Sequence, residues 1–306
     1  MRKNFKLTLV ALALLALTAC EKEPAIVHDG ERYPILFGNY ETRATAGLDD
    51  LKEDGFKVYA YLKGNTNNIH TFEKEVTYSL AQNVWGYEGL EYWIPGATYW
   101  FKAFYPTEPS AGTLTVDNTS STQPFTITDF KISEQEDIMV ATAERIVADG
   151  AKLPTNGSNV VDLNFQHLLA NVTIKAKSEI DNVTVSDISL EDIAQTGNYS
   201  NGKWESEQTV TINKQYSGEA LVKNAEDFVD VTGGGFLVIP EAIGGRQKMI
   251  IRTSHKNYDV VIPTITWEPG KKYTYTLTIK QENIEFNEPG VDIWDEENAT
   301  GSVVIK

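Results

Sequence analysis

Cysteine and histidine are scarce in this chain, and each scarcity excludes a class of chemistry. The 306 residues include one cysteine and four histidines. A single thiol forms no internal disulfide and no site with several thiolate ligands, so packing alone must stabilise the fold. The four histidines are His28, His70, His167 and His255. They are far apart in sequence, and no H-E-x-x-H or G-x-S-x-G pattern occurs. We therefore predict no enzyme, no cofactor and no metal site. A catalytic pair of carboxylates would leave no such pattern, so this kind of enzyme stays open.

Positive charge is also in short supply. The chain has 27 lysines and arginines against 43 aspartates and glutamates, which gives a formal net charge of -16. No basic cluster occurs in the region expected to fold, so the phosphates of a nucleic acid would find nothing to attract them. We therefore exclude nucleic acid as a partner.

The longest apolar run stands at the N-terminus and is too short to remain as a membrane span. Arg2 and Lys3 give a positive start, residues 9–17 form the apolar run, and Thr18-Ala19 precede Cys20. A transmembrane helix needs about 20 apolar residues, whereas this order is typical of a lipoprotein signal peptide over residues 1–19. We predict cleavage before Cys20 and acylation of its thiol, for example with palmitate, as the membrane anchor. A secreted protein with an accidental cysteine at this position is the alternative.

Strand signals run through the rest of the chain. Valine, isoleucine, threonine and tyrosine alternate with polar residues and are interrupted by glycine, asparagine and proline. The clearest predicted strands are residues 56–63, 98–105, 171–177, 208–213, 235–239, 248–253 and 272–280. Only the stretch 134–148 has a composition that suits a helical turn or two. The pattern predicts an all-β fold of the sandwich type.

The polar stretch 152–159 contains proline and glycine and predicts a domain junction. It would separate an N-terminal β-sandwich domain (44–158) from a C-terminal one (159–306). The motif Trp-x-Pro-Gly-x-x-Tyr occurs once in each, from Trp93 to Tyr99 and from Trp267 to Tyr273. Pro-Gly suits the centre of a type II turn. The repeat indicates related architectures, or else two independent hairpin corners.

One short strand is predicted before the first domain. Within residues 31–46, Tyr33, Ile35 and Phe37 alternate with other residues. The sequence Glu-Thr-Arg-Ala-Thr-Ala-Gly (41–47) follows, and small residues around one arginine are what proteases cut most easily. Arg43 is thus a candidate processing site, and an ordinary surface arginine in a linker is the alternative.

The C-terminus carries three apolar segments. They are Ile284 with Phe286, then Val291, Ile293 and Trp294, and finally Val303, Val304 and Ile305 after the polar spacer 295–301. Apolar strands at a terminus must be buried, either on their own sheet or on the sheet edge of another subunit. The pattern alone favours the first option and leaves the second open.

Five features resemble, in their order, the fimbrillin family of Bacteroidetes surface pili. They are the Thr42-Arg43-Ala44 step, the stretch 137–141, the stretch 165–170 with the strand after it, the second Trp-x-Pro-Gly-x-x-Tyr motif, and Trp294. Together with the lipoprotein signal, the resemblance covers nearly the whole chain. His167 lies inside one of these stretches, and we interpret it as a structural residue.

The resemblance implies two tandem β-sandwich domains of transthyretin-like, Greek-key topology in a subunit of a type V pilus. It implies a precursor on the surface of the outer membrane, held by lipid on Cys20 and cut between Arg43 and Ala44 by an Arg-specific protease. The lipidated propeptide (20–43) would leave with its strand. The C-terminal strands of a neighbouring subunit would fill the gap by donor-strand exchange, through Val291, Ile293, Val303 and Ile305.

The partners implied are copies of this chain and other fimbrillin subunits, with a host or bacterial surface receptor as the target of adhesion. A stalk, tip or anchor position is left open. The alternative function is a surface-exposed glycan-binding lipoprotein. The first domain is rich in aromatic residues that stack on sugars, namely Trp85, Tyr87, Tyr92, Trp93, Tyr99, Trp100, Phe101 and Tyr105. Adjacent strand residues point to opposite faces, so we expect most of these rings in the core.

Overall fold

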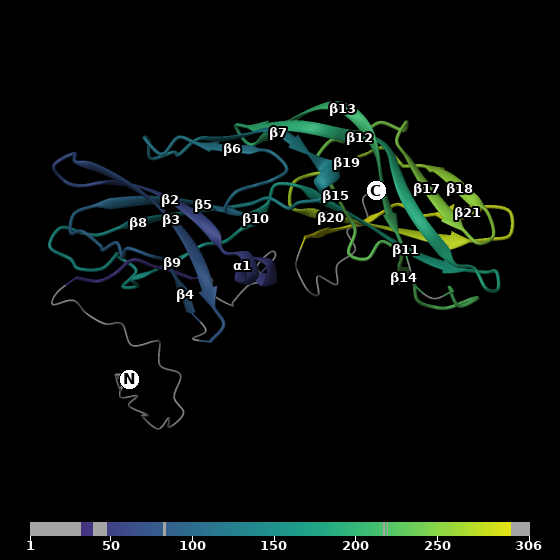
Figure 1. The fold of residues 1–306 in the computed structure, drawn as a ribbon, viewed down its shortest axis with the longest axis horizontal. Coiled ribbons are helices and arrows are strands. Elements are labelled where there is room, and N and C mark those ends of the chain that lie inside the picture. The colour runs from purple at the N-terminus through teal and green to yellow at the C-terminus, as the bar shows by residue number, and fades with distance from the viewer. Residues whose placement is uncertain (1–31, 39–47, 82–83, 217, 219, 295–306) are drawn as a thin grey trace, which may run out of the picture.

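The computed structural model describes residues 32–38, 48–81, 84–216, 218 and 220–294, and these are nearly all strands, turns and loops. Figure 1 shows two β-rich units side by side, the earlier part of the chain on the left and the later part on the right. The predicted all-β class is confirmed. In the described ranges no helix is long and apolar enough to cross a membrane.

A six-stranded antiparallel sheet forms the first unit, in the order β10-β8-β5-β2-β3-β4. Its strands are β2 (Phe56–Lys63), β3 (Ile69–Ser79), β4 (Val84–Gly86), β5 (Thr98–Tyr105), β8 (Met139–Ile146) and β10 (Gln166–His167). Alternate residues of the central strands, such as Val58 in β2 and Phe101 in β5, are buried in what we call the N-terminal core. Period-two burial is what the sequence alternation predicts.

Two more elements close the N-terminal core. Strand β1 (Leu36–Gly38) pairs with β9 (Val160–Asp162) in a parallel two-stranded sheet, and helix α1 (Leu48–Asp54) buries Leu51 completely. The helix stops at Gly55, which has a φ of +77° and donates its N–H to the carbonyl oxygen of Leu51. A Cβ at Gly55 would lie 2.5 Å from the carbonyl oxygen of Val76, so glycine is required there.

The second unit is a sandwich of two sheets. One contains β14 (Val229–Asp230), β11 (Ala170–Ser178), β20 (Lys271–Ile279) and β21 (Ile284–Phe286), with β15 (Phe236–Val238) and β22 (Gly290–Ile293) at its margins. The other contains β18 (Asn257–Val261), β17 (Lys248–Thr253), β12 (Val185–Ser200), β7 (Phe125–Lys131) and β6 (Thr113–Val116), with β13 (Lys203–Gln215) beside β12. A small pair, β16 (Ala242–Ile243) and β19 (Ile265–Thr266), lies apart. Buried residues of β11, such as Val172, share the C-terminal core with those of β12, such as Leu190.

The hairpin of β6 and β7 links the two units. It comes from the first half of the chain, yet β7 pairs with β12 of the second sandwich. The N-terminal core, in turn, continues beyond residue 158, because Val161, Leu163 and Phe165 belong to it. The domain limits at 158 and 159 stay a prediction. Segments of the first core and segments of the second core follow one another more than once along the chain.

Most predicted strands are confirmed, and one expectation about helix is wrong. Strands β2, β5 and β17 occupy the predicted residues, and β11, β13, β15 and β20 overlap theirs. The stretch 134–148, expected to hold a helical turn or two, holds the end of a short 3-10 turn, η1 (Ile132–Glu134), and then strand β8. Met139 and Ala141 alternate towards the core and β8 pairs with β5, so tertiary pairing overrides the helix-favouring alanine and glutamate content. The described α-helix, α1, was not expected.

Candidate functional site: the β1 cleft

Strand β1 and the residue before it, Ile35, are hydrogen-bonded to the chain on two sides. On one side Leu36 donates its N–H to the carbonyl oxygen of Asn159 at 2.9 Å, and the Gly38 carbonyl oxygen accepts from the N–H of Leu163 at 3.1 Å. On the other side Ile35 donates to the carbonyl oxygen of Glu91 at 2.8 Å. The structure therefore confirms the expected N-terminal strand and places it between β9 and residues 91–93, a site that we call the β1 cleft.

Side chains of β1 and of Ile35, the residue directly before it, complete the N-terminal core. Ile35 is 0% exposed and Phe37 is 4% exposed. The Phe37 ring lies 5.4 Å from the ring of Tyr87 and 5.7 Å from that of Phe101, measured between centroids. Leu36, between the two, is half-buried and stands opposite Val160 in the parallel ladder. These two buried side chains, two residues apart, are the apolar groups that fill the β1 cleft.

The hydroxyl of Tyr87 adds a polar contact to β1. It donates to the carbonyl oxygen of Ile35 at 2.7 Å and accepts the N–H of Glu91 at 3.2 Å. Burial raises the pKa of Tyr87 to about 12, and the bond from the Glu91 N–H only partly offsets this. The phenol is therefore a neutral donor at every physiological pH.

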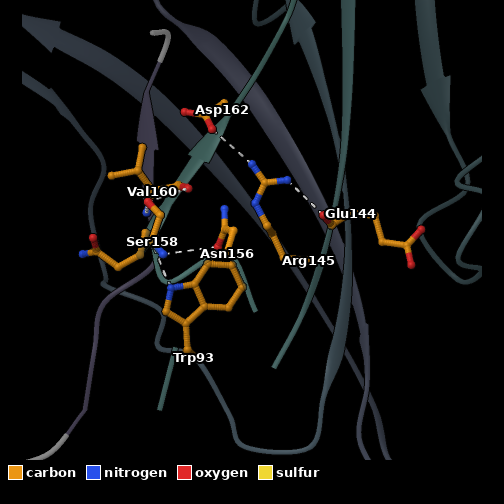
Figure 2. A network of polar contacts seen from close by, with 8 residues as sticks. Trp93, Glu144, Arg145, Asn156, Ser158, Val160 and Asp162 are labelled. Carbon is orange, nitrogen blue, oxygen red and sulfur yellow. Dashed lines mark hydrogen bonds and ion pairs between the residues drawn. The ribbon is translucent and has the colours of Figure 1, made fainter. Parts of the chain in front are cut away.

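A set of side chains fixes the strand that receives β1. The indole N–H of Trp93 donates to the carbonyl oxygen of Asn159 at 3.3 Å. Arg145 lies 3.4 Å from the carboxylate of Asp162 and donates to the carbonyl oxygen of Glu144 at 2.9 Å. Figure 2 shows Trp93 next to Ser158 in the segment that leads into β9, and Arg145 between Asp162 and Glu144. The wall of the cleft is thus held by contacts that do not involve β1.

The turn before β9 is ordered by its own polar residues. The Ser158 N–H donates to Asn156 Oδ1 at 3.2 Å, and the Val160 N–H donates to Ser158 Oγ at 3.0 Å. Side-chain oxygens that accept nearby backbone N–H groups are typical of tight turns. The stretch interpreted from sequence as an inter-domain junction is therefore an ordered part of the cleft.

Five of the site residues predicted from the sequence, for lipidation, cleavage and strand donation, lie outside the described residues. These are Cys20, Arg43 and Ala44, and also Val303 and Ile305. Strand β1 ends at residue 38 and helix α1 begins at residue 48, so Arg43 belongs to the connection between two described elements. A cut after Arg43 would separate β1 from the rest of the chain covalently.

The structure places Val291 and Ile293 on their own sheet. β22 pairs antiparallel with β20, with Val291 opposite Tyr273 and Ile293 opposite Lys271. Val291 packs against the C-terminal core, whereas Ile293 is 49% exposed. Of the two options that the sequence left open, these two residues and those of β21 thus follow the first, pairing with a sheet of their own chain. Whether any of them serves as a donor remains a prediction.

His167 holds the last described residue in place. Its ring stacks on Trp294 with centroids 3.5 Å apart and planes 8° apart, and its Nδ1 lies 2.5 Å from Asp137 Oδ2. The Trp294 N–H also donates to the carbonyl oxygen of Gly270 at 3.0 Å. The side chain of His167 is 3% exposed, in keeping with the structural role expected for it. The described part of the chain therefore ends at a residue that is held by a ring stack and a backbone hydrogen bond.

Sequence reasoning found β1 but missed its partners. Val160, Val161 and Asp162 form only a three-residue strand directly after a polar turn, and a run that short gives no clear periodic signal. Tyr87 was noted only as one of many aromatic residues. Across the described ranges no three His, Cys, Asp or Glu side chains gather in a way that could hold a metal ion.

The structure has two β-rich cores, and an N-terminal strand completes the first of them. Proteins with these features are the ones to compare with this chain. The chain matches the fimbrillin-like family over residues 42–294, and it belongs to that family. The matched range begins after β1 and ends at Trp294, the last described residue. No curated protein matches the chain.

Solved structures show the same fold at low sequence identity. A fimbrial protein from Bacteroides vulgatus is 19% identical with a TM-score of 0.63, over 86% of this chain and 99% of that one. A protein described as a candidate cell adhesion protein, from Bacteroides uniformis, is 16% identical with a TM-score of 0.56, over 88% and 100%. A third, from Bacteroides ovatus and described in the same way, is 12% identical with a TM-score of 0.54, over 87% and 99%.

Proposed function

We propose that this chain is a structural subunit of a surface fimbrium that contributes to cell adhesion. It would be exported as a precursor with lipid on Cys20, anchored in the outer membrane, and matured by an Arg-specific protease that cuts between Arg43 and Ala44. The family and the fold of its solved relatives support a fimbrial role. One observation carries the maturation step. Strand β1 is buried in the N-terminal core, and its covalent connection to the rest of that core runs through residues 39–47.

Removal of β1 would leave the cleft in need of a replacement. Ile35 and Phe37 are fully or almost fully buried, and burial of such a side chain contributes roughly 1.5–3 kcal/mol, so the pair contributes about 3–6 kcal/mol. The carbonyl oxygen of Glu91 would also lose the N–H of Ile35, and that of Asn159 would keep only the indole N–H of Trp93. An apolar cleft with unpaired backbone groups is what an added strand stabilises.

The end of a neighbouring subunit supplies a segment of the right pattern. Val303 and Ile305 are two residues apart, as Ile35 and Phe37 are, and Val304 corresponds to the half-buried Leu36. We assign Val303 to the position of Ile35 and Ile305 to that of Phe37. The polar spacer 295–301 and Ser302 together make eight residues, which extend to at most about 26–29 Å, so they can bridge two subunits that stand end to end.

The test is to block the cut without disturbing the fold. Arg43→Ala should leave the protein full-length, acylated and unpolymerised, as read from intact mass and from electron microscopy of the cell surface. Arg43→Lys keeps the positive charge and should behave like Arg43→Ala if the protease is specific for arginine. Arg246→Ala, an exposed arginine after β16, is the matched control and should mature normally.

The outcomes separate cutting from assembly. A mature N-terminus at Ala44 in the wild type, with fibres that are absent from both Arg43 variants, supports the proposal. Normal fibres from Arg43→Ala would show that processing at this arginine is not needed. Full-length acylated wild-type protein on every cell, without fibres, would favour an anchor or a glycan-binding lipoprotein instead.

A further inference from the structure

Trp100 lies on the face of the N-terminal sheet that points away from the core. Its neighbours in β5, Tyr99 and Phe101, are 0% and 1% exposed and belong to the N-terminal core, so Trp100 points the other way. It is only partly buried, and the ring of Tyr61 in β2 packs beside it, with centroids 5.8 Å apart and planes 54° apart. The indole is therefore held in one orientation without being enclosed.

A cavity of about 300 Å³ opens beside this ring. Residues of β5 and β8 form its floor, and Ser121, Thr122 and Gln123 of the loop between β6 and β7 form one rim. In Figure 1 this hairpin extends over the N-terminal sheet. The volume is at the lower end of the range for small-molecule sites, roughly 300–1,000 Å³, and suits one small ring with its substituents.

The rim of the cavity is fixed before any ligand arrives. The ammonium of Lys102 donates to the carbonyl oxygens of Thr122 and Gln123 at 2.9 and 2.5 Å. Gln123 is 1% exposed, and its side-chain amide donates to the carbonyl oxygen of Tyr59 in β2 at 3.0 Å. The loop is thus bonded to two strands of the sheet. A preformed site loses less conformational entropy on binding than one that must order first.

Polar groups surround the aromatic wall. Glu144 in β8 stands directly opposite Trp100 in the strand ladder, and Thr142 stands opposite Lys102. The carboxylate of Glu144 accepts hydrogen bonds, and the hydroxyl of Thr142 both donates and accepts them. The ammonium of Lys102 has three donor protons and uses two of them on the loop. The cavity therefore offers acceptors and donors around one flat apolar surface.

We propose that this cavity binds a neutral pyranose residue of a glycan, with one C–H face of the sugar on Trp100 and its hydroxyls bonded to Glu144 and to the loop. A sugar ring combines an apolar face with a rim of hydroxyls, which is the pattern that the cavity presents. A purely apolar ligand would make no use of the Glu144 carboxylate or of the remaining proton of the Lys102 ammonium. An anionic ligand would face the Glu144 carboxylate, and a cationic one the Lys102 ammonium.

The site is separate from the β1 cleft. Phe101 in β5 contacts Phe37 on the core side of the sheet, whereas Trp100 lies on the other face. A strand that fills the β1 cleft therefore leaves the sugar site open, so every subunit of a fibre can carry one. Many weak sites on one fibre bind a glycan-covered surface far more tightly than a single site does.

The experiment is saturation-transfer NMR on the purified protein with the methyl glycosides of glucose, galactose, mannose and N-acetylglucosamine. Glucuronate serves as the anionic comparison. Trp100→Ala should weaken binding about tenfold or more, and Glu144→Gln should weaken it as well. Glu73→Gln is the matched control, because Glu73 lies on the same face in β3, pairs with Lys57 and does not line the cavity.

The expected result is binding of at least one neutral glycoside that depends on Trp100 and Glu144 and is unchanged in Glu73→Gln. The proposal is overturned if no neutral glycoside binds at millimolar concentration, if glucuronate binds more tightly than all of them, or if both cavity variants bind as the wild type does. Should Trp100→Ala fail to fold, the comparison of Glu144→Gln with Glu73→Gln decides. None of these outcomes depends on cleavage at Arg43.

Discussion

The ring of Phe37 in β1 meets the ring of Phe101 in β5 nearly edge-on, with centroids 5.7 Å apart and planes at 80°. One partner would leave with the propeptide and the other stays in the sheet. Under the proposed maturation, the contact would stabilise the precursor and would be absent from the mature subunit until another strand replaces it. This difference can be measured.

Phe37→Ala should destabilise the uncut protein by about 3–5 kcal/mol, because it removes a ring that is 4% exposed and leaves a cavity in the N-terminal core. The measurement is the urea midpoint of the uncut chain. Leu36→Ala, at the half-buried position between the two buried side chains, is the control and should cost clearly less. After a cut at Arg43 the two variants and the wild type have the same sequence and should unfold alike. Equal losses for the two variants would mean that β1 is not recognised through its inward side chains.

Tyr87→Phe should loosen β1 and change how stability depends on alkaline pH. Burial raises the pKa of Tyr87 to about 12, above its ordinary value near 10, so the folded state holds the phenolic proton more tightly. This contribution is fully present below pH 10 and is lost as the pH rises towards 12. The variant should be about 1–2 kcal/mol less stable at pH 8, since the Ile35 carbonyl loses its donor.

Denaturation of the uncut protein at several pH values from 8 to about 12 tests the alkaline part of that expectation. Tyr87→Phe should lose less stability over this window than the wild type does. An identical loss in both proteins would show that Tyr87 does not release its proton on unfolding in this range, and the assigned link to β1 would fail.

The repeated Trp-x-Pro-Gly-x-x-Tyr motif builds the same corner twice. Tyr99 donates its hydroxyl to the carbonyl oxygen of Tyr92 at 3.2 Å and accepts the Ile94 N–H at 2.8 Å. Tyr273 bonds in the same way to the carbonyl oxygen and the N–H that lie seven and five residues before it, both at 2.8 Å. These bonds are local to the motif, so both interpretations, related architectures and two independent hairpin corners, stay open.

Tyr99→Phe and Tyr273→Phe should each cost about 1–3 kcal/mol, because each leaves a backbone donor and acceptor without their partner. The two corners belong to different cores, so the double variant should lose the sum within about 0.5 kcal/mol. Urea unfolding of the three proteins measures this. A clear departure from additivity would mean that the two corners interact energetically.

The corner and the strands were visible in the sequence because they depend on local signals. Alternation places β2, β5 and β17 correctly, and Pro-Gly with a tyrosine marks the corner. Helix α1 was missed because its seven residues form less than two full turns. The composition of strand β8 suits a helix because alanine and glutamate favour helices, whereas its pairing with β5 depends on residues far away in the sequence.

The partners of each strand were beyond the reach of the sequence. Alternation indicates which residues face a core, but it does not indicate which core. Residues 113–131 were assigned to the first domain, yet β6 and β7 join the sheet of the second. For the same reason the sequence predicted β1 but not its pairing with β9. The rim of the cavity beside Trp100 depends on that hairpin and was equally hidden.

Asp230→Asn should destabilise the protein at neutral pH and reduce its sensitivity to acid. Burial opposes ionisation of Asp230, but hydrogen bonds from Thr232 and from Gly234 outweigh it and hold the pKa of the carboxyl below its ordinary value. Its contribution is present above about pH 4 and is lost as the pH falls through the lowered pKa. Denaturation between about pH 5 and pH 2 tests this, with the exposed Asp259→Asn as control. The assignment fails if the two variants respond to acid alike.

Charged substitutions in the C-terminal residues should separate the two candidate donor segments. Val303→Asp or Ile305→Asp would put a carboxylate into the apolar β1 cleft, so either change should abolish fibres while leaving cleavage at Arg43 intact. Ile293→Asp is the matched variant, because Ile293 is 49% exposed on β22 and tolerates a charge in the isolated subunit. Electron microscopy and the mass of the processed chain give the two readouts. If Ile293→Asp stops assembly and Val303→Asp does not, β22 must leave β20 and act as the donor. If fibres form in all of these variants, neither C-terminal segment is the donor and a different chain must fill the β1 cleft. A donor strand with aspartate at an inward position would not replace the apolar contacts of Ile35 and Phe37.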